Sequence, residues 1–309
     1  MSRKENSVTN YFKYKYWTGG SSESWLDMDR VARHRKYLRF ERAAENGKLA
    51  NGDFYIISVD VGRLSANTII HVFRVHPKEN YYQKYLVYTE TLYDTHFNDQ
   101  AVRIKQLNNL YMPKEIVVDG NGLGIGLVDA LIMTNTDPNT GTDYEPIGVS
   151  NDEEYLKRQD STAAKVLFVL KTNASDAGLI HSNCYIQLSS GRVTFLAPER
   201  LVRNKLMATK KGQRMNLLQR KTFLMPYEMT SRLFDELANL KVKPKPTGFD
   251  VEQITRRIHK DRFSALEYGL WRIKAYEDAW TKEKNKKSKG MTNFVMFTPK
   301  TGVKSRNRR

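Results

Sequence analysis

The sequence is poor in several features that identify common classes of protein. It contains one cysteine, Cys184, among 309 residues, which excludes an intramolecular disulfide framework and a cysteine-based zinc site. A reducing compartment is therefore expected. No run of about 18 apolar residues occurs, so the sequence predicts no transmembrane helix and no membrane partner. Residues 1–16 are polar and lack the apolar region of a signal peptide, which favours a cytoplasmic setting.

Acidic residues are missing where basic residues are densest. The formal net charge is +17, yet 40% of the residues are hydrophobic, which is enough for a packed core. Residues 200–221 and 282–309 account for the whole excess of positive charge, and the rest of the chain is neutral. This distribution predicts a globular body with two basic attachments for a polyanion. The basic residues of the first segment are Arg200, Arg203, Lys205, Lys210, Lys211, Arg214, Arg220 and Lys221.

The hydrophobic pattern predicts a mixed α/β arrangement. Short apolar runs at 54–60 and 115–119 are typical of buried strands. Two further strands, at 68–75 and 83–91, would complete a three-stranded meander with the first. The expected helices cover 25–46, 101–111, 127–133, 161–171, 231–240 and 261–279. A hairpin is expected from strands at 185–188 and 192–196 joined by a Ser-Ser-Gly turn.

Three acidic residues stand at the ends of predicted elements. Asp60 ends the first strand, Asp119 ends the fourth, and Asp261 begins the last helix. If the two strands are neighbours, their carboxylates face each other at the edge of the sheet where ligands collect. Carboxylates gathered there repel unless cations neutralise them, and oxygen donors suit Mg²⁺ or Mn²⁺. Two such ions could cleave a phosphodiester.

Each acidic residue also has a structural explanation. An acid after a strand often caps a helix or serves a turn, which applies to Asp60 and Asp119. Asp261 could be the N-cap of its helix, and His259 alone is more often structural than catalytic. The basic segment 282–309 could be a solvated charge run.

A glycine-rich turn at 120–126 is similar to a nucleotide-binding loop but lacks its partners. No Lys-Ser or Lys-Thr follows it, and the GxGxxG order of a dinucleotide fold is absent. Because no GxxxxGK[ST] occurs anywhere in the sequence, ATP hydrolysis by this chain is not expected.

Three motifs together resemble the nuclease domain of tailed-bacteriophage terminase large subunits. They are Val-Asp-Val-Gly at 59–62, Ile-Val-Val-Asp-Gly-Asn-Gly-Leu-Gly at 116–124 and His-Lys-Asp-Arg-Phe-Ser-Ala-Leu-Glu-Tyr at 259–268. The third is the most specific. The resemblance covers about residues 53–280. It implies an RNase H-like fold, a mixed central sheet flanked by helices with an added β-hairpin and basic loop, and two-metal cleavage of concatemeric double-stranded DNA during packaging.

The resemblance also implies roles for single residues. Asp60, Asp119 and Asp261 would bind two ions, Mg²⁺ or Mn²⁺, with His259 as an auxiliary catalytic residue. The basic residues of 200–221 would hold DNA beside the site. Arg262 would contact phosphate, or pair with an acid and orient it.

The resemblance implies partners and a domain plan too. The partners would be double-stranded DNA, a terminase ATPase domain, the small terminase subunit and the portal, in the host cytoplasm. Residues 1–52 would be a linker and helix following an ATPase domain that this chain lacks, 53–281 the nuclease domain, and 282–309 a flexible basic tail.

Two other functions remain open at this point. Another RNase H-like nuclease, such as a Holliday-junction resolvase or a transposase-like enzyme, would share the acids but cut different DNA. A non-catalytic DNA-binding or packaging-scaffold protein would use the basic segments without the acids.

Overall fold

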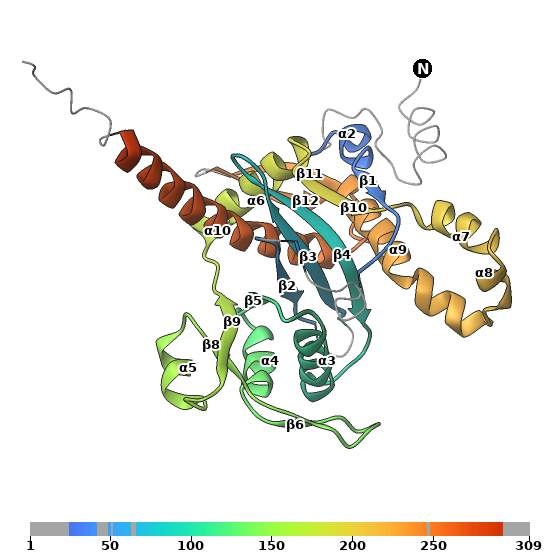
Figure 1. Ribbon diagram of the computed structural model, residues 1–309, viewed down its shortest axis with the longest axis horizontal. Coiled ribbons are helices and arrows are strands. Elements are labelled where there is room, and N and C mark those ends of the chain that lie inside the picture. The colour runs from blue at the N-terminus through green and yellow to red at the C-terminus, as the bar shows by residue number, and fades with distance from the viewer. Residues whose placement is uncertain (1–24, 42–48, 51, 63–65, 246–247, 293–309) are drawn as a thin grey trace, which may run out of the picture.

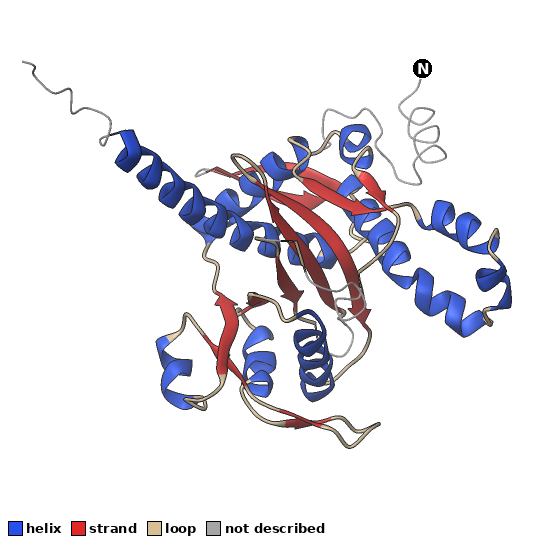
Figure 2. Ribbon diagram, in the orientation of Figure 1, coloured by secondary structure: helices blue, strands red, loops and turns tan. Residues whose placement is uncertain are grey.

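The fold is built around one eight-stranded sheet with helices on both faces (Figures 1 and 2). A computed structural model describes residues 25–41, 49–50, 52–62, 66–245 and 248–292. The sheet has the strand order β1-β10-β4-β3-β2-β5-β9-β8. Its strands are β1 (Arg35–Tyr37), β2 (Phe54–Asp60), β3 (Thr68–Pro77), β4 (Tyr82–Leu92), β5 (Glu115–Asp119), β8 (Ile147–Val149), β9 (Ala164–Leu170) and β10 (Val193–Leu196). Two small antiparallel pairs lie outside it, β6 (Asn135–Thr136) with β7 (Asp143–Tyr144) and β11 (Leu240–Lys245) with β12 (Gly248–Gln253).

The centre of the sheet confirms the predicted fold class. Strands β2, β3 and β4 form the expected antiparallel meander. On its other side β2 pairs in parallel with β5, β5 with β9, and β9 with β8. An antiparallel meander continued by parallel strands and covered by helices is the RNase H-like arrangement expected from the sequence.

The helices form two layers with separate apolar cores. The first layer, α6, α9 and α10, packs against one face of the sheet in a cluster that includes Leu188, Leu233 and Leu266. The second, α3 and α4, packs against the other face around Ile104 and Leu127. The helices are α2 (Met28–Ala32), α3 (Phe97–Tyr111), α4 (Gly124–Leu131), α5 (Glu153–Arg158), α6 (Ala174–Ser189), α7 (Glu199–Met207), α8 (Lys210–Arg214), α9 (Leu217–Ala238) and α10 (Asp261–Thr292). None of these described helices is long and apolar enough to cross a membrane.

The helix predicted over 161–171 is wrong, because that segment is strand β9. Its apolar run ends in Leu167, Phe168, Val169 and Leu170, and β9 lies between β5 and β8 with both neighbours parallel to it. A strand covered on both faces has no polar side, so its apolar residues do not alternate and can be mistaken for a helix.

The hairpin predicted over 185–196 is also wrong. Residues 185–188 belong to α6, in which Ile180, Cys184 and Leu188 are buried at helical spacing. After α6 the chain turns at Gly191, whose φ of +70° favours glycine. It then enters β10, which pairs in parallel with β4. The antiparallel pair β11–β12, which comes later in the chain, was not predicted.

The N-terminal segment and the last helix differ from the predicted boundaries. Instead of one helix over 25–46, the chain forms the short α2 and then β1, which pairs with β10 at the sheet edge; residues 42–48 lie outside the described residues. Helix α9 starts well before 231, and α10 continues to Thr292, beyond the 281 at which the sequence places a domain end. Most of the predicted basic tail, 293–309, also lies outside the described residues.

Candidate active site

Asp60 and Asp119 end two neighbouring parallel strands. Val59 of β2 pairs with Val118 of β5, so the next residue of each strand, the aspartate, stands at the same edge of the sheet. Strand side chains alternate between faces, which places Asp119 on the face of Val117, a member of the cluster under α10. Both carboxylates therefore end their strands on the side where the sequence expected a ligand site.

Helix α10 is fixed over the same face by hydrogen bonds to the sheet. The Ser58 hydroxyl donates to the Ala265 carbonyl at 2.6 Å. Because Ser58 and Asp60 are two residues apart on β2, they share a face, and Asp60 points toward α10. Gly269 permits the close approach, since a Cβ there would lie 2.5 Å from the Phe73 ring and 2.9 Å from the Ser58 hydroxyl. Asp261 thus begins the helix that covers the other two acids.

The pKa of Asp60 responds to the charges of both other carboxylates. Burial, then the negative charges of Asp261 and Asp119, raise the pKa of Asp60 well above its usual range. Tyr268 lies on α10, seven residues after Asp261. Its pKa is also raised, because it is buried and lies near the charges of Asp119 and Asp60. We call Asp60, Asp119 and Asp261 the acidic edge.

The turn after Asp119 holds its carboxylate in place. The backbone N–H of Asn121 donates to Asp119 Oδ1 at 3.0 Å, and burial nevertheless raises the pKa of Asp119. A Cβ at Gly124 would lie 1.6 Å from the Asp119 carbonyl oxygen, and one at Gly120 would lie 2.3 Å from Val169. The glycines therefore let α4 begin directly against the end of β5, which is a packing role rather than the nucleotide-binding role considered above.

The acidic edge has the donor chemistry for a divalent cation but not a closed coordination shell. Among the residues that the structure describes, no three His, Cys, Asp or Glu side chains are arranged to hold a metal ion. The three carboxylates nevertheless supply hard oxygen donors on one face. Burial first, and then repulsion by Asp261 and Asp119, raise the pKa of Asp60, and a cation beside it would offset both effects. The residue types therefore suit Mg²⁺ or Mn²⁺, although the described side chains are not arranged as a coordination shell.

Two predicted site residues have unequal surroundings. His259 is exposed, two residues before Asp261 in the loop leading to α10. Arg262 is buried, with only 6% of its surface exposed, and its guanidinium lies 2.7 Å from the Glu236 carboxylate. Of the two roles that the resemblance implies for Arg262, this buried pair corresponds to the second, pairing with an acid.

Tyr268 and Glu236 were missed as site residues by the sequence analysis. Tyr268 closes the third motif, so its spacing from Asp261 was a usable signal. Glu236 lies on α9, 25 residues before Asp261 in the chain, and no local sequence pattern identifies it. Burial raises the pKa of Glu236 to about 7, against the opposing effect of Arg262. Only the packing of α9 against α10 brings it to the acidic edge.

The predicted DNA-binding residues lie together on a projecting helical segment. Helices α7 and α8 and the start of α9 extend away from the body (Figure 1). We call residues 199–221 the basic arm. All of its Lys and Arg side chains are exposed except Arg220, which is half-buried and donates to the Met215 carbonyl. Arg203 pairs with Glu199 at 2.6 Å.

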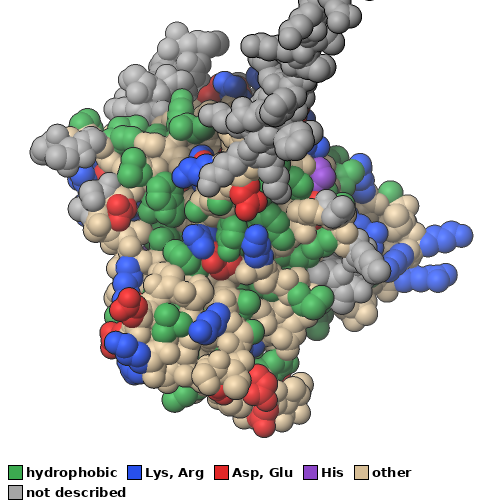
Figure 3. Space-filling model, turned by 60° about the vertical axis from the view of Figure 1, so that its left-hand side comes forward, with side chains coloured by type: hydrophobic (Ala, Val, Ile, Leu, Met, Phe, Trp, Pro, Cys, Tyr) green, Lys and Arg blue, Asp and Glu red, His purple; other side chains and the backbone are tan. Residues whose placement is uncertain are grey.

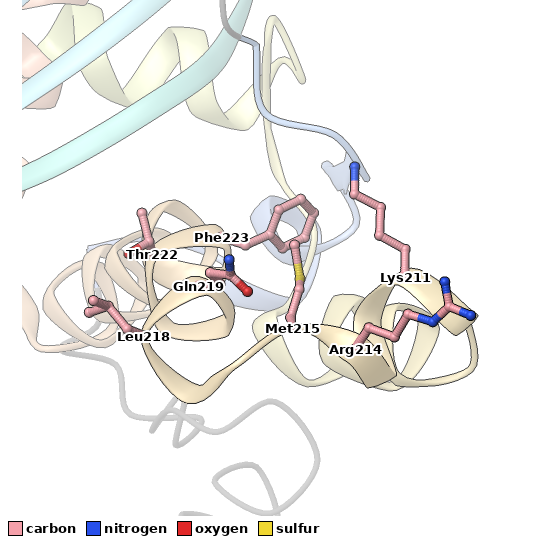
Figure 4. A pocket seen from close by; sticks show the side chains of 7 residues that line it. All are labelled: Lys211, Arg214, Met215, Leu218, Gln219, Thr222 and Phe223. Atoms are coloured by element: carbon pink, nitrogen blue, oxygen red, sulfur yellow. The ribbon is translucent and has the colours of Figure 1, made fainter.

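The basic arm carries a hollow of about 520 Å³ between α8 and α9 (Figure 4). Lys211 and Arg214 lie on one side of it, and Met215, Leu218 and Phe223 supply apolar contacts. A second hollow of about 760 Å³ lies between α3 and α4, where it is lined by Phe97, Gly126, Asp129 and their neighbours. Neither hollow includes a residue of the acidic edge. One face of the body shows hydrophobic, acidic and basic side chains intermixed, with Lys and Arg extending at its right-hand edge (Figure 3).

Several solved structures are similar to this chain. The large terminase nuclease from thermophilic phage G20c with bound magnesium is 15% identical, with 81% of this chain and 97% of that chain covered and a TM-score of 0.47. The nuclease domain of the large terminase subunit of bacterial virus Sf6 is 12% identical, covering 80% and 98%, with a TM-score of 0.43. The large terminase nuclease domain of bacteriophage SPP1 with bound Mn is 12% identical, covering 77% and 97%, with a TM-score of 0.39.

These structures belong to the family that the sequence motifs resemble. A scan against protein-family models finds no match, and a search of the curated proteins finds none either. Because the identities and TM-scores are low, the function of this chain has to be argued from its own residues.

Proposed function

We propose that this protein is a metal-dependent endonuclease that cuts concatemeric double-stranded DNA during viral genome packaging, as the nuclease part of a terminase large subunit. The observation that supports the proposal is that Asp60 and Asp119 end paired parallel strands of an RNase H-like sheet, where burial and then the charges of Asp261 and Asp119 raise the pKa of Asp60. Carboxylates that repel one another in a folded protein are typical of a site that takes up cations.

The chain's own residues divide the work of this reaction. Asp60, Asp119 and Asp261 would hold two Mg²⁺ or Mn²⁺ ions, which when bound would supply an activated water and stabilise the leaving 3′ oxygen. The Asn121 N–H orients Asp119, and the Ser58 hydroxyl fixes α10 and so the position of Asp261. His259, which is exposed and two residues before Asp261, would be the auxiliary residue that contacts DNA near the cut.

The basic arm would hold the substrate through its phosphates. Its exposed Lys and Arg side chains supply attraction that does not depend on sequence. The body lacks a comparable excess of charge, so the arm is the main candidate for retaining DNA while the acidic edge cuts it. A terminase ATPase domain, the small terminase subunit and the portal are the proposed partners, and the host cytoplasm is the proposed location.

The test is cleavage of linear duplex DNA in Mn²⁺ by the wild type and by Asp261→Asn. We expect the variant to lose at least about 100-fold in rate, since even outer-shell partners of a metal site are commonly worth 10–100-fold. Asp278→Asn is the matched control, because Asp278 lies on the same helix and is exposed, where it pairs with Lys274. The control should cut at the wild-type rate.

Three results would contradict the proposal. Equal cleavage by wild type and Asp261→Asn would remove the acidic edge from the reaction. Strong preference for a four-way junction over a linear duplex would favour a junction resolvase. If the wild type binds DNA but cuts none in Mg²⁺ or Mn²⁺, the protein is a non-catalytic DNA-binding protein.

A further inference from the structure

A buried ion pair between Glu236 and Arg262 lies next to Asp261 of the acidic edge. Glu236 of α9 accepts from the Arg262 guanidinium at 2.7 Å through one carboxylate oxygen. Its other oxygen accepts from the backbone N–H of Phe263 at 3.0 Å. Glu236 is 3% exposed and Arg262 is 6% exposed, so both charges are removed from water.

Two strands of the sheet also contact the first turn of α10. The Arg262 guanidinium also donates to the Thr91 hydroxyl of β4 at 3.0 Å. The Arg262 carbonyl is hydrogen-bonded by His71 of β3 at 3.0 Å; burial lowers the pKa of His71 to about 4, so at neutral pH the ring is uncharged and donates its proton from Nε2. Contacts from α9, β3 and β4 therefore converge on Arg262 and Phe263, the two residues that follow Asp261.

A buried ion pair is a poor device for stability alone. Desolvation of two charges costs several kcal/mol per ion, and well-packed apolar residues of similar size are often as stable or more so. The N–H of Phe263 is one of the unpaired donors of a helix start, and a nearby cap residue would satisfy it more simply. An acid from another helix instead fixes this turn relative to α9.

We propose that Glu236 is a positioning residue, which together with Arg262 holds the first turn of α10 so that the Asp261 carboxylate stays directed at Asp60 and Asp119. This inference rests on the proposed function, because it assigns a cause to the geometry of the acidic edge. Helix α9 would then have two roles, because its first residues belong to the basic arm and Glu236 lies in its last turn.

Mn²⁺ affinity, measured by calorimetry and by the electron paramagnetic resonance signal of free Mn²⁺, tests the proposal without relying on cleavage. Glu236→Gln keeps the size of the side chain but removes its charge. We expect it to weaken Mn²⁺ binding about 10-fold, the lower end of the effect of outer-shell partners. Glu228→Gln is the matched control, since Glu228 lies on the same helix and forms an exposed pair with Arg232 at 2.9 Å. It should bind Mn²⁺ like the wild type.

Two further variants separate positioning from loss of stability. Arg262→Lys keeps the positive charge beside Glu236 but cannot reach Glu236 and Thr91 together, so it should weaken Mn²⁺ binding as Glu236→Gln does, and it serves if Glu236→Gln does not fold. Leu107→Ala removes a buried side chain in the core on the other face of the sheet. If Leu107→Ala weakens Mn²⁺ binding as much as Glu236→Gln, the effect is a global loss of stability and the proposal is overturned.

Asp119→Ala separates this inference from the proposed function. It should abolish Mn²⁺ binding at the acidic edge. If it binds Mn²⁺ like the wild type, the metal site itself is wrong. If Asp119→Ala abolishes binding while Glu236→Gln and Arg262→Lys leave it unchanged, the metal site stands and the positioning role of Glu236 is overturned.

Discussion

The acidic edge and the basic arm carry opposite charges and are built in opposite ways. The acidic edge takes single residues from β2, β5 and α10, and each is placed by contacts made far along the chain. The basic arm takes eight residues from one continuous segment of 22 residues, 200–221. To attract DNA, the basic arm needs only exposed residues of like charge. To bind a cation, the acidic edge needs residues of β2, β5 and α10 to lie close together.

This difference predicts how each region responds to substitution. A site built from converging elements fails when one residue is changed, because a cation requires several donors at once. A surface that attracts phosphates loses affinity in steps, roughly one increment for each charge. The three predictions below test that contrast, beginning with the largest expected effect.

Asp60→Asn should abolish cleavage and spare DNA binding. Asp60 is the acid whose pKa responds to both of the others. Loss of one metal ligand should reduce the cleavage rate by at least about 100-fold. Chelating the divalent cation with EDTA should reduce the wild-type rate in the same way. DNA affinity in gel-shift or anisotropy assays should not fall. If Asp60→Asn lost DNA binding together with cleavage, the acidic edge and the basic arm would not have separate roles.

Neutralising three arm residues together, Lys210, Lys211 and Arg214, to Gln should weaken duplex binding without changing cleavage at saturating DNA. Each phosphate contact contributes about 0.9 to the slope of log affinity against log salt, so the slope should fall by roughly 3 if all three contact phosphate. Affinity at low salt should fall by about 100-fold.

The matched control for this triple variant lies on the hairpin β11–β12. Lys241 and Lys243 are paired with Glu252, at 3.4 and 3.0 Å. Because an acid already neutralises them, their change to Gln should alter the salt slope less than an equal number of arm changes. An equal or larger effect would move the DNA surface from the arm to the hairpin.

His181→Gln should have the smallest effect, a loss of about 1–2 kcal/mol in the free energy of unfolding at acidic pH. Buried beside α10, His181 contacts Glu267 at 2.7 Å and Asp250 at 3.1 Å. Burial lowers the pKa of His181, but these two acids more than offset that and raise it above 6.5. The folded state therefore holds the proton more tightly than the unfolded state, so this stability is fully present below pH 6.5 and is lost as pH rises through the folded-state pKa.

Unfolding curves of wild type and His181→Gln at pH 5.5, 7 and 8.5 measure this effect. The difference between them should shrink as pH rises. Arg203→Gln on the arm is the comparison, because its exposed pair with Glu199 should be worth no more than about 0.5 kcal/mol at any pH. A His181→Gln difference that is constant with pH would mean that the ring acts by packing alone.

Much of the core fold could be predicted from local pattern. Strands β2, β3, β4 and β5 and helix α3 occur where the sequence indicated them. Strands β2 and β5 are short apolar runs that each end on an acid, and α3 has apolar residues at helical spacing. Strand β9 and helix α6 could not, since an apolar run covered on both faces carries no periodicity that separates strand from helix. The hairpin β11–β12 has three lysines and two prolines in its first half, which hid its pairing.

The candidate site divides in the same way. Asp60, Asp119 and Asp261 were identifiable because each ends or begins a recognisable element and lies in a motif. The sequence left two roles open for Arg262, a phosphate contact or a pair with an acid. Burial decides between them, and burial at 262 depends on the packing of α9, which supplies Glu236. Glu236 had no signal at all.

The sequence by itself determined the chemistry available to this protein: three acids at element ends, a neutral body and two basic segments. Residue type and local spacing are properties of the chain that folding does not alter. Only the tertiary structure decided which of these groups meet. Pairing of β2 with β5 brought two acids to one edge, and the packing of α10 against the sheet and α9 added the third. Those contacts join residues 27 to 207 positions apart in the chain, and only a complete fold brings them together.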